Sequence, residues 1–399
     1  MAQDIFFQGV VAPLRLGNAD AVLQLLPAIA TGWPYRVTAA DPALRPFFSI
    51  TAQPGTDRFR CEGHLEPALA RSFDAVNAAC DAMAVLAQAL PLDDRRLLCL
   101  HAAGVVLSGQ LWVFPNIRRA GKSTLSVALA HAGHAVYSDD VVPLILPQDG
   151  PARGLALGIA PRLRLPLPDT AGQGFRDWVA GVPGPRNRQY QYLALTGQPV
   201  HGDSLPVAGF VILDRQDSPV AARLDPVPPD VAMDALLHQN FTRDRHSGEV
   251  LQAIADLLAL RPVCRLQYSD LTDAVDCLAA GLPTSPVATD LPGPMRLFRP
   301  AQVDTAAPPL RPGAPIRQRP GSVARAIGDA MYLADPEGRA IHRMDPLAAA
   351  IWDVLDEPAT ATDLQDLLAE SFPATDPARI AADLDNLLRM LAAWGLVES

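Results

Sequence analysis

The sequence has few of the features that mark secreted, membrane-bound or disulfide-rich proteins. Its five cysteines are odd in number and widely spaced, and no Cys-x-x-Cys pair occurs, which argues against a disulfide framework or a zinc site and predicts reduced thiols. The first residues contain no basic segment leading into a long apolar run, and no apolar run reaches the roughly 18 residues of a membrane span. We therefore expect a cytoplasmic protein with no membrane partner.

An excess of positive charge is also absent. The 33 Lys and Arg residues are outnumbered by 43 Asp and Glu residues, which gives a net charge of -10. A protein that binds the nucleic-acid backbone needs a basic face, so we expect no nucleic-acid partner. By contrast, 49% of the 399 residues are hydrophobic, enough for one large core and a smaller second domain.

Prolines recur at short intervals from Leu282 to Gly321. Proline lacks an N–H and interrupts helices and inner strands, so this composition predicts an extended linker and a domain boundary. The predicted parts of the chain are an N-terminal accessory region (1–95), an α/β domain (96–281), the linker (282–321) and a small C-terminal α+β domain (322–399).

Hydrophobic periodicity and turn residues predict the elements of each part. In the accessory region we expect a strand at the start and helices at about 21–29 and 66–90. In the α/β domain we expect strands at 97–100, 104–107, 110–114, 135–138 and 141–146, and a helix at 123–134. In the C-terminal domain we expect strands at 322–327, 331–333 and 339–343, then helices at 346–355, 362–370 and 377–394.

The segment between the strand at 110–114 and the next helix has most of a phosphate-binding loop. Gly121-Lys122-Ser123-Thr124 matches the end of the G-x-x-x-x-G-K-[ST] pattern, whereas Asn116 replaces its first glycine. Such loops bind phosphate through converging backbone N–H groups at the positive end of a helix. Asparagine tolerates the positive φ for which glycine is used there. The predicted nucleotide-binding residues are Asn116, Arg118, Arg119, Ala120, Gly121, Lys122, Ser123 and Thr124.

Two acids follow the next predicted strand. Asp139 and Asp140 are suited to activate an acceptor hydroxyl and to hold a metal ion, although a pair of solvated turn acids has the same pattern. His101 begins a strand and either approaches these acids or is structural.

These segments together resemble the catalytic core of HPr kinase/phosphorylase and its relatives. The residues that carry the resemblance are Leu100-His-Ala-Ala-Gly-Val-Val-Leu, the Gly121-Lys-Ser-Thr loop and Ala132-Gly-His-Ala-Val-Tyr-Ser-Asp-Asp-Val-Val. The resemblance implies a P-loop α/β fold that transfers phosphate from ATP, with Mg²⁺, to a serine, in a family whose members are often homo-oligomers. It further implies that Lys122 binds phosphate, that Asp139 is the base supported by His101 and Asp140, and that Ser123 and Asp140 hold the metal.

The family's later Glu-x-Arg-Gly signature has no visible counterpart in this chain. The sequence has Gly158-Ile-Ala-Pro-Arg-Leu-Arg-Leu instead. Four arginines in and after this segment are either further phosphate ligands or surface residues: Arg162, Arg164, Arg186 and Arg188.

The C-terminal domain resembles the PqqD-like family of peptide-recognition domains, with a winged-helix-like plan. The resemblance rests on 342–356, Leu364, Leu367-Leu368 and 380–397. It implies that the leader of a ribosomally synthesised precursor peptide is added as a strand at 339–343, against the helix that contains Arg379, Leu384 and Leu388. Trp352 and Trp394 are expected in the core.

The two resemblances predict an ATP-dependent kinase that phosphorylates a serine or threonine of a precursor peptide. The C-terminal domain holds the leader, and the linker keeps the modifiable end at a high local concentration. Two alternatives stay open: a pseudokinase that binds and delivers the peptide, and a different group transfer to the same peptide.

Overall fold

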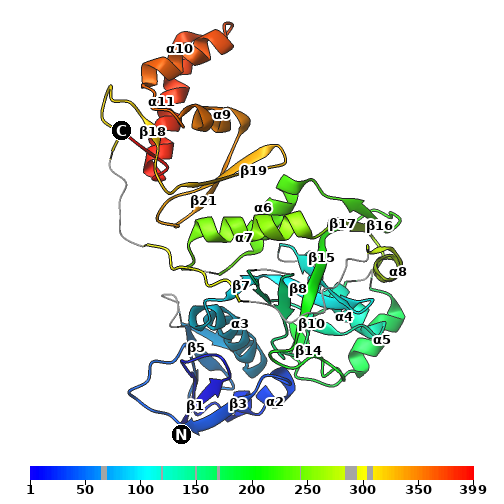
Figure 1. Cartoon of the computed structure of the whole chain (residues 1–399). Helices are drawn as coiled ribbons and strands as arrows, with labels where there is room; N and C mark the ends of the chain where they lie inside the picture. Colours follow the sequence, from blue (N-terminus) through cyan, green and yellow to red (C-terminus); the bar gives the residue numbers. More distant parts are fainter. Residues whose placement is uncertain are drawn as a thin grey trace. The chain divides into compact units, whose positions relative to one another are not determined.

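The computed structural model describes residues 1–63, 70–117, 120–148, 151–168, 171–242, 244–283, 294–302 and 309–399. These residues divide by packing into two compact units (Figure 1). Unit 1 contains Met1–Val227, Ala235–Arg243 and Leu260–Leu297, and unit 2 contains Pro228–Asp234, Asp244–Ala259 and Phe298–Ser399. The domain ranges drawn from the sequence stay predictions.

The N-terminal part of unit 1 is a six-stranded sheet covered by one long helix. Its strands are β1 (Ala2–Phe7), β2 (Leu14–Gly17), β3 (Tyr35–Ala39), β4 (Phe48–Ala52), β5 (Phe59–Gly63) and β6 (Arg71–Phe73). The order is β3-β1-β2-β4-β5-β6, and only β2 and β4 are parallel neighbours. The helices are α1 (Asp20–Leu23), α2 (Leu26–Ile29) and α3 (Ala75–Asp93). Most of this sheet was not predicted from the sequence.

The helix predicted at 21–29 is divided in the structure. It consists of the short helices α1 and α2, and Pro27 lies in the first turn of α2. Proline lacks the N–H that a continuous helix would use at this position, whereas the first turn of a helix does not require it. The single proline therefore accounts for the difference.

The second predicted helix begins later than residue 66. Residues 64–69 lie outside the described part of the chain, and Arg71–Phe73 forms strand β6 beside β5. Helix α3 starts at Ala75, where the Asp74 carboxylate accepts a hydrogen bond from the N–H of Asn77 at 2.9 Å. A side-chain cap of this kind fixes the first turn of a helix.

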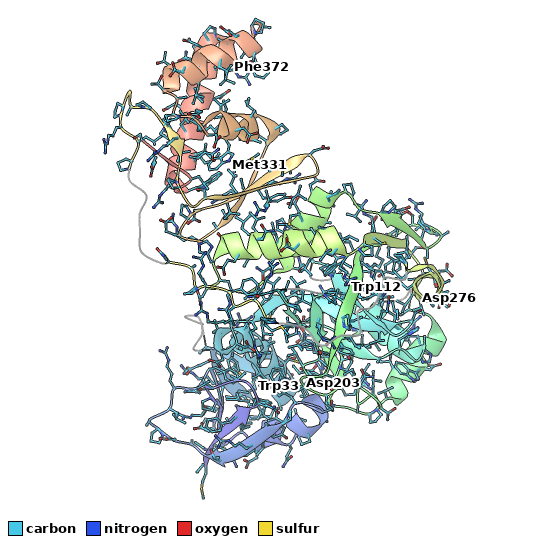
Figure 2. The ribbon with its side chains drawn as sticks, viewed as in Figure 1. Trp33, Trp112, Asp203, Asp276, Met331 and Phe372 are labelled. Atoms are coloured by element: carbon cyan, nitrogen blue, oxygen red, sulfur yellow. The ribbon has the colours of Figure 1, made fainter. Side chains whose placement is uncertain are left out.

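Helix α3 contradicts the expectation that no apolar segment is long enough to span a membrane. It has 19 residues, and an 18-residue window within it has a mean hydropathy of 1.4. However, 61% of that window is buried within the protein. Ala78, Ala82 and Leu86 are fully buried in the same core as Trp33 (Figure 2). Its apolar side chains therefore already have packing partners, as in the core helices of globular proteins.

The larger sheet of unit 1 has nine strands. They are β7 (Leu97–Leu100), β8 (Ala102–Leu107), β9 (Gln110–Pro115), β10 (Val136–Ser138), β11 (Val142–Ile145), β12 (Arg153–Leu155), β15 (Ser204–Arg215), β16 (Arg223–Pro226) and β17 (Val263–Tyr268). Seven follow the order β10-β8-β9-β15-β12-β11-β7, and β17 joins β15 to β16. The five strands predicted between residues 97 and 146 are confirmed, with ends shifted by at most two residues.

Helices α4 (Lys122–His131) and α8 (Leu271–Gly281) pack on this sheet. Their apolar side chains share a core with Trp112 of β9, which is 1% exposed (Figure 2). The remaining elements that lie within or begin in unit 1 are α5 (Gln173–Gly181) and the two-stranded pair β13 (Arg162–Arg164) and β14 (Tyr190–Tyr192). Helix α6 (Pro229–Gln239) contributes residues to both units.

Unit 2 combines a three-stranded sheet with three helices, as the sequence predicts. Its elements are β18 (Arg317–Gln318), β19 (Val323–Ile327), β20 (Ala330–Ala334), β21 (Ile341–Met344), α9 (Pro346–Val354), α10 (Ala361–Ser371), α11 (Pro377–Ala393) and β22 (Val397–Glu398). The antiparallel sheet has the order β19-β20-β21. Its core includes Leu333, Trp352, Leu364 and Leu391.

Unit 2 also contains the first turns of α6 and most of α7 (Ser247–Leu260), which were not predicted to belong to the C-terminal domain. Arg343 of β21 forms ion pairs with Asp230 and Asp234 of α6, at 3.0 and 2.6 Å. The Tyr332 hydroxyl of β20 donates to the Asp234 carboxylate at 2.8 Å. These polar contacts join the sheet to a segment more than 90 residues earlier in the chain.

The described part of the predicted linker is only partly extended. Residues 284–293 and 303–308 lie outside the described residues. Ile316 is 4% exposed and exchanges two backbone hydrogen bonds with Ala359, and β18 pairs with β22. Prolines are tolerated beside such short edge pairings because the intervening residues keep their N–H groups. The part of the predicted linker from residue 309 onward therefore belongs to the folded unit 2.

The turn between β20 and β21 is organised around a buried acid. Asp335 is 1% exposed, and its carboxylate accepts backbone N–H groups of Glu337, Arg339 and Ala340 at 3.0–3.1 Å and the Arg339 guanidinium at 3.2 Å. Burial acts to raise the pKa of Asp335, but these hydrogen bonds and the arginine charge outweigh it and lower the pKa. The negative charge is therefore fully compensated.

Candidate functional site

Four strands of the larger sheet end at the same edge. β9, β15 and β17 are parallel, and β10 runs with them because it is antiparallel to β8, which is antiparallel to β9. His101 lies at this edge too, since Ala102, which follows it, pairs with Pro115 at the end of β9. Ligand sites of open α/β sheets form outside the carboxyl ends of the strands. The chain places Asn116, Gly121, Asp139, Asp140, Arg215 and Tyr268 there.

The loop after β9 leads directly into α4 through Gly121. This glycine is left-handed, with φ of 97°, and a Cβ atom on it would lie 3.0 Å from the Tyr268 hydroxyl. Both the backbone conformation and the close approach therefore require glycine. Within the described residues no side chain caps α4, so the N–H groups of its first turn are suited to bind an anion.

Lys122 is the first residue of α4 and is 7% exposed. Its ammonium donates to the carbonyl oxygens of Asn116 at 2.5 Å and Ile117 at 3.1 Å, and its charge acts to lower the pKa of Asp140. Lys122 is also the sole lysine among the 33 basic residues of the chain. Since lysine and arginine bind phosphate differently, a single lysine at the loop is a sequence signal that our reading of the motif did not use.

Asn116 does not have the left-handed conformation expected of it, and its binding of nucleotide stays a prediction. Among the described non-glycine residues, positive φ occurs at Asn18, Ser108 and Asp244, so Asn116 does not replace a left-handed glycine. Its side-chain amide instead donates to the carbonyl of Leu213 in β15 at 2.7 Å, and its oxygen accepts the N–H of Ile117 at 2.8 Å. Asn116 therefore fastens the start of the loop to the neighbouring strand.

Asp139 is a buried acid with little compensation for its charge. It is 6% exposed, and one carboxylate oxygen accepts the backbone N–H of Arg162 at 3.0 Å. Burial raises the pKa of Asp139 to about 6, and repulsion from Asp140 adds to this effect, while Arg162 opposes it. The Ser123 hydroxyl reaches the backbone oxygen of the same residue at 3.5 Å. A carboxylate of this pKa can take up a proton near neutral pH.

Asp140 is the partly exposed member of the pair. Its carboxylate contacts His101 Nε2 at 3.1 Å and Arg162 Nη2 at 3.7 Å, and 41% of the side chain is exposed. Burial acts to raise the pKa of Asp140, but the hydrogen bond from His101 and the charge of Arg162 lower it overall. The pKa values of the two neighbouring acids are thus shifted in opposite directions, as expected when one acid keeps its charge and the other exchanges a proton.

His101 and Arg162 are each oriented by a further residue. His101 Nδ1 lies 3.1 Å from the Gln239 side-chain oxygen, at the end of α6, so both ring nitrogens have partners. The Arg162 guanidinium lies over the Tyr190 ring, 4.9 Å from its centre. The prediction that His101 approaches the acids is therefore met, whereas Gln239 and Tyr190 were missed because nothing in the local sequence marks them.

The other predicted residues divide into three groups. Arg118 and Arg119 lie outside the described residues. Ala120 and Thr124 are half-buried beside the loop and in the first turn of α4. Of the four arginines considered as phosphate ligands, Arg162 alone contacts the acids within the described structure, whereas the others are exposed: Arg164, Arg186 and Arg188.

The predicted metal ligands can supply oxygen atoms but not a complete coordination shell. No group of three or more His, Cys, Asp or Glu side chains gathers around one point in the described structure. Ser123 and Asp140 offer a hydroxyl and a carboxylate, the ligand type that Mg²⁺ takes, and this ion usually fills its remaining positions with phosphate oxygens and water. The residues present therefore fit Mg²⁺ bound together with a phosphate.

Unit 2 offers a sheet edge at β21. This strand pairs with β20 and with no other described strand. Leu384 and Leu388 of α11, expected to line a groove beside it, are instead 5% and 3% exposed and belong to the core. Trp394, which follows α11, is half-buried and stacks on His342 of β21 with ring centres 3.9 Å apart.

Two comparisons with known proteins found a similarity. Residues 331–397 match the family model described as "Coenzyme PQQ synthesis protein D (PqqD)", and this range runs from β20 to β22. Among solved structures, the chain is similar to the Hpr(Ser) kinase/phosphatase from Coxiella burnetii, at 13% identity and a TM-score of 0.21, over 43% of this chain and 78% of that one. A likeness this distant does not bear on activity. No curated protein matches the chain significantly.

Proposed function

We propose that this protein transfers phosphate from ATP to a serine or threonine hydroxyl of a ribosomally synthesised precursor peptide. One arrangement supports this most strongly. The only lysine of the chain opens the helix after the loop, at the sheet edge where a buried aspartate has a pKa raised to about 6. A cation for phosphate and a base for a hydroxyl are the two groups that phosphoryl transfer needs.

Asp139 is the base in this proposal. In the transfer step, the hydroxyl oxygen forms a bond to the γ-phosphorus, and the bond from that phosphorus to the β,γ-bridging oxygen breaks. The electron pair of the broken bond leaves with ADP, and the hydroxyl proton passes to the Asp139 carboxylate. Asp140 keeps its charge and, through His101 at 3.1 Å and Arg162 at 3.7 Å, orders the groups around the acceptor.

The positive groups act on the phosphate. Lys122 and the first-turn N–H groups of α4 would bind its oxygens, and Arg162 would stabilise charge that develops during transfer. Mg²⁺, held by Ser123 and Asp140, would neutralise charge on the phosphates.

We assign recognition of the peptide to residues 331–397. The PqqD match and the available edge of β21 support binding of the leader as an additional strand, with backbone hydrogen bonds for affinity. Because the leader binds away from the reacting hydroxyl, its binding raises the effective concentration of that hydroxyl at the carboxyl edge of the large sheet of unit 1. We place this activity in the cytoplasm, where ATP and newly made peptide are both present.

A second candidate is a protein that binds and delivers the peptide without transferring phosphate. The observation that favours it is the set of internal bonds in the loop. Lys122 donates to two loop carbonyls, and Asn116 is tied to β15, so a phosphate would compete with bonds already formed. Transfer of a different group from another phosphate-bearing cosubstrate uses the same residues and is a third candidate.

One experiment separates the three. The full chain is incubated with the peptide encoded beside its gene, ATP and Mg²⁺, and the intact mass of the peptide is measured. Addition of one phosphate supports our proposal, and a different added mass identifies another transfer. An unchanged peptide, in a sample where calorimetry shows that ATP and peptide are both bound, supports delivery alone. A leaderless peptide is the matched control and should be modified more slowly.

A further inference from the structure

The strand pair β13–β14 presents arginine and tyrosine side chains on one face, beside the acid pair. Arg162 lies opposite Tyr192, and Arg164 lies opposite Tyr190. Alternate residues of a strand share a face, and residues directly opposite each other share it too, so these four side chains form one arginine face. The backbone N–H of Arg162 donates to the Asp139 carboxylate at 3.0 Å. Arg164 is therefore the next residue on this face, one strand repeat away from the acid.

Arg164 is held in place on the arginine face but has no acid beside it. Its Nη2 donates to the Tyr190 hydroxyl at 3.3 Å, and its guanidinium lies 5.5 Å from the centre of the Tyr190 ring. The side chain is exposed, and no Asp or Glu of the described residues lies within ion-pair distance of it. Arg15, Arg319 and Arg343, by contrast, contact acids at 2.5–2.7 Å. Arg164 is therefore an oriented cation whose charge is available to a ligand.

The turn before β14 adds a second uncompensated charge. Both oxygens of Asp74 accept hydrogen bonds from the Asn187 side chain in this turn, at 2.9 and 3.0 Å, and one also accepts the N–H of Asn77. Arg188, which follows Asn187, is exposed and has no ion-pair partner in the part of the chain that the structure describes. The net charge of the chain is -10. Uncompensated positive charge on so acidic a protein favours an anionic ligand at this surface.

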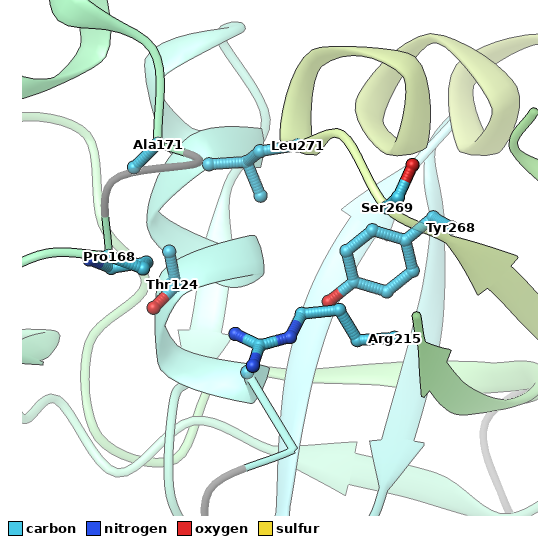
Figure 3. Close-up of a pocket in the computed structure, with 8 residues that line it drawn as sticks. Thr124, Pro168, Ala171, Arg215, Tyr268, Ser269 and Leu271 are labelled. Carbon is cyan, nitrogen blue, oxygen red and sulfur yellow. The ribbon is translucent and has the colours of Figure 1, made fainter. Parts of the chain in front are cut away.

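Arg215 is another arginine near the phosphate-binding loop, but its surroundings do not admit a peptide side chain. It lines a small pocket together with Thr124 and Tyr268 (Figure 3). This cavity measures about 20 Å³, which is room for one water molecule. Arg215 also has an acidic neighbour, Asp217, at 3.9 Å. Arg164, which is exposed and has no such neighbour among the described residues, is therefore better placed to meet an acceptor peptide.

The spacing along β13 determines where an acidic group of the peptide would lie. Residues two positions apart in a strand are about 6–7 Å apart, and an extended peptide has the same repeat. A hydroxyl at Asp139 and a carboxylate at Arg164 can therefore belong to peptide residues two positions apart. A guanidinium binds a carboxylate with two parallel hydrogen bonds, and the contact with Tyr190 reduces the freedom that Arg164 loses on binding.

We propose that Arg164 binds a carboxylate of the acceptor peptide, on a residue two positions from the hydroxyl that is phosphorylated. Arg188 adds to the positive potential of this surface. The inference rests on the proposed function, because it takes the reacting hydroxyl to lie at Asp139. It adds a substrate class, namely acceptor segments in which an Asp or Glu lies two residues before or after the modified serine or threonine.

The test is a cycle of substitutions in the protein and in the peptide. The precursor peptide is made with Glu or Gln two residues before, or two residues after, the phosphorylated position, and KM is measured with the full chain. We expect Glu at one of these positions to lower the peptide KM about 3- to 10-fold relative to Gln. In Arg164→Gln this difference should vanish, while the KM for ATP stays within about 2-fold of that of the unchanged protein, because only the peptide loses a contact.

Arg186→Gln is the matched control. Arg186 forms a bridge with Gln191, whose side-chain amide donates to the Val179 carbonyl at 3.0 Å. Because Gln191 alternates with Tyr190 along β14, Arg186 lies on the face opposite the arginine face. It is exposed and carries the same charge as Arg164. The preference for Glu should therefore persist in Arg186→Gln.

The outcomes separate this inference from the proposed function. Equal KM values for the Glu and Gln peptides at both positions would overturn the inference, as would a Glu preference that persists in Arg164→Gln. A raised KM for ATP with an unchanged peptide KM in that variant would assign Arg164 to the nucleotide instead. If no peptide is phosphorylated, the proposed function fails. Calorimetry with Glu or Gln two residues from each serine and threonine then decides: a Glu preference that depends on Arg164 supports the inference, and equal affinities overturn it.

Discussion

The two units treat a buried aspartate in opposite ways. Asp335 in unit 2 receives three backbone N–H groups and an arginine, and its pKa is lowered. Asp139 in unit 1 is buried almost as deeply but has its pKa raised to about 6 by burial and by the adjacent Asp140. Asp335 therefore stabilises the turn that it occupies, whereas the charge of Asp139 destabilises the fold.

The carboxylate of Asp335 accepts four hydrogen bonds, whereas that of Asp139 accepts the backbone N–H of Arg162. Groups with strongly perturbed pKa values concentrate at functional sites. The raised pKa of Asp139 therefore supports the proposal that Asp139 is the functional acid, on grounds that do not depend on the loop motif.

The largest expected effect, apart from that at Asp139 itself, concerns Lys122, whose charge acts on the neighbouring Asp140. Lys122→Arg keeps the charge but replaces a compact ammonium with a planar guanidinium, and we expect phosphate transfer to fall by about 100-fold or more. The opposite substitution at an exposed position, Arg223→Lys, should leave the rate of phosphate transfer unchanged. Both variants are compared with the unchanged protein by their rates of peptide phosphorylation. Equal rates for Lys122→Arg and the unchanged protein would show that Lys122 does not act on the phosphate.

The same lysine allows a direct check of where the phosphates bind. Apart from the N-terminus, Lys122 provides the only primary amine of the chain. An acyl phosphate of ATP, whose carbonyl reacts with a nearby amine to form an amide and release ATP, should therefore label Lys122. Excess ATP should block this labelling. Peptide mapping identifies the labelled residue. Labelling of Met1 alone would contradict the assignment of Lys122 to the phosphate site.

Asp335→Asn should cost about 3 kcal/mol of folding free energy at neutral pH, because an amide in this position presents a donor to N–H groups and removes one of the two acids that pair with Arg339. The wild-type advantage is present above the ordinary pKa of 3.8 and is lost as the pH falls through the lowered pKa. Denaturant unfolding across this range measures it. Asp383→Asn, at a largely exposed position, is the control and should change stability little.

Asp139→Asn should change the folding free energy at neutral pH in the direction opposite to Asp335→Asn. The pKa of Asp139 is raised from 3.8 to about 6, so its ionisation removes stability as the pH rises, by at most roughly 3 kcal/mol above pH 6. The variant should therefore match the wild type below pH 4 and exceed its stability at pH 7.5. Unfolding curves at pH 4, 5 and 7.5 follow the difference, and a variant less stable than wild type at pH 7.5 would show that the charge of Asp139 is compensated after all.

The smallest effect is expected at Asn116. Asn116→Ala removes the hydrogen bond to the Leu213 carbonyl and should cost about 1 kcal/mol of stability. Asn386→Ala, on the exposed face of α11, is the matched control and should be neutral or slightly stabilising. Chemical denaturation measures both, and indistinguishable values would mean that this hydrogen bond does not fasten the loop to β15.

The sequence was most informative where function depends on consecutive residues. The strand, loop and helix around Gly121 and the acid pair after β10 were predicted within a few residues, because their periodicity and turn residues are local. Apart from the first strand, the N-terminal sheet was missed, although β2, β4 and β5 alternate between buried and more exposed residues, because each has only 4 or 5 residues. The left-handed conformation expected of Asn116 was wrong, and its hydrogen bond to Leu213 was not predicted because that carbonyl is 97 residues away in the sequence.

The parts of the site that were missed share one cause. Gln239, Tyr190 and Tyr268 reach the site through strand order and helix packing, so no pattern near them in the sequence distinguishes them from ordinary core residues. The packing of α7 into unit 2 was not predicted for a related reason, since it depends on contacts such as the hydrogen bond between Gln252 and Arg325.

The central claim is that Asp139 accepts the proton of the hydroxyl that is phosphorylated. The most direct test is the rate of phosphate transfer to the precursor peptide, at saturating ATP and peptide, between pH 5 and 8 in the wild type and in Asp139→Asn. We predict a wild-type rate that rises with pH around an apparent pKa near 6, and a variant about 100- to 10,000-fold slower in which that rise is absent. A variant with the wild-type rate and the same pH dependence would contradict the account.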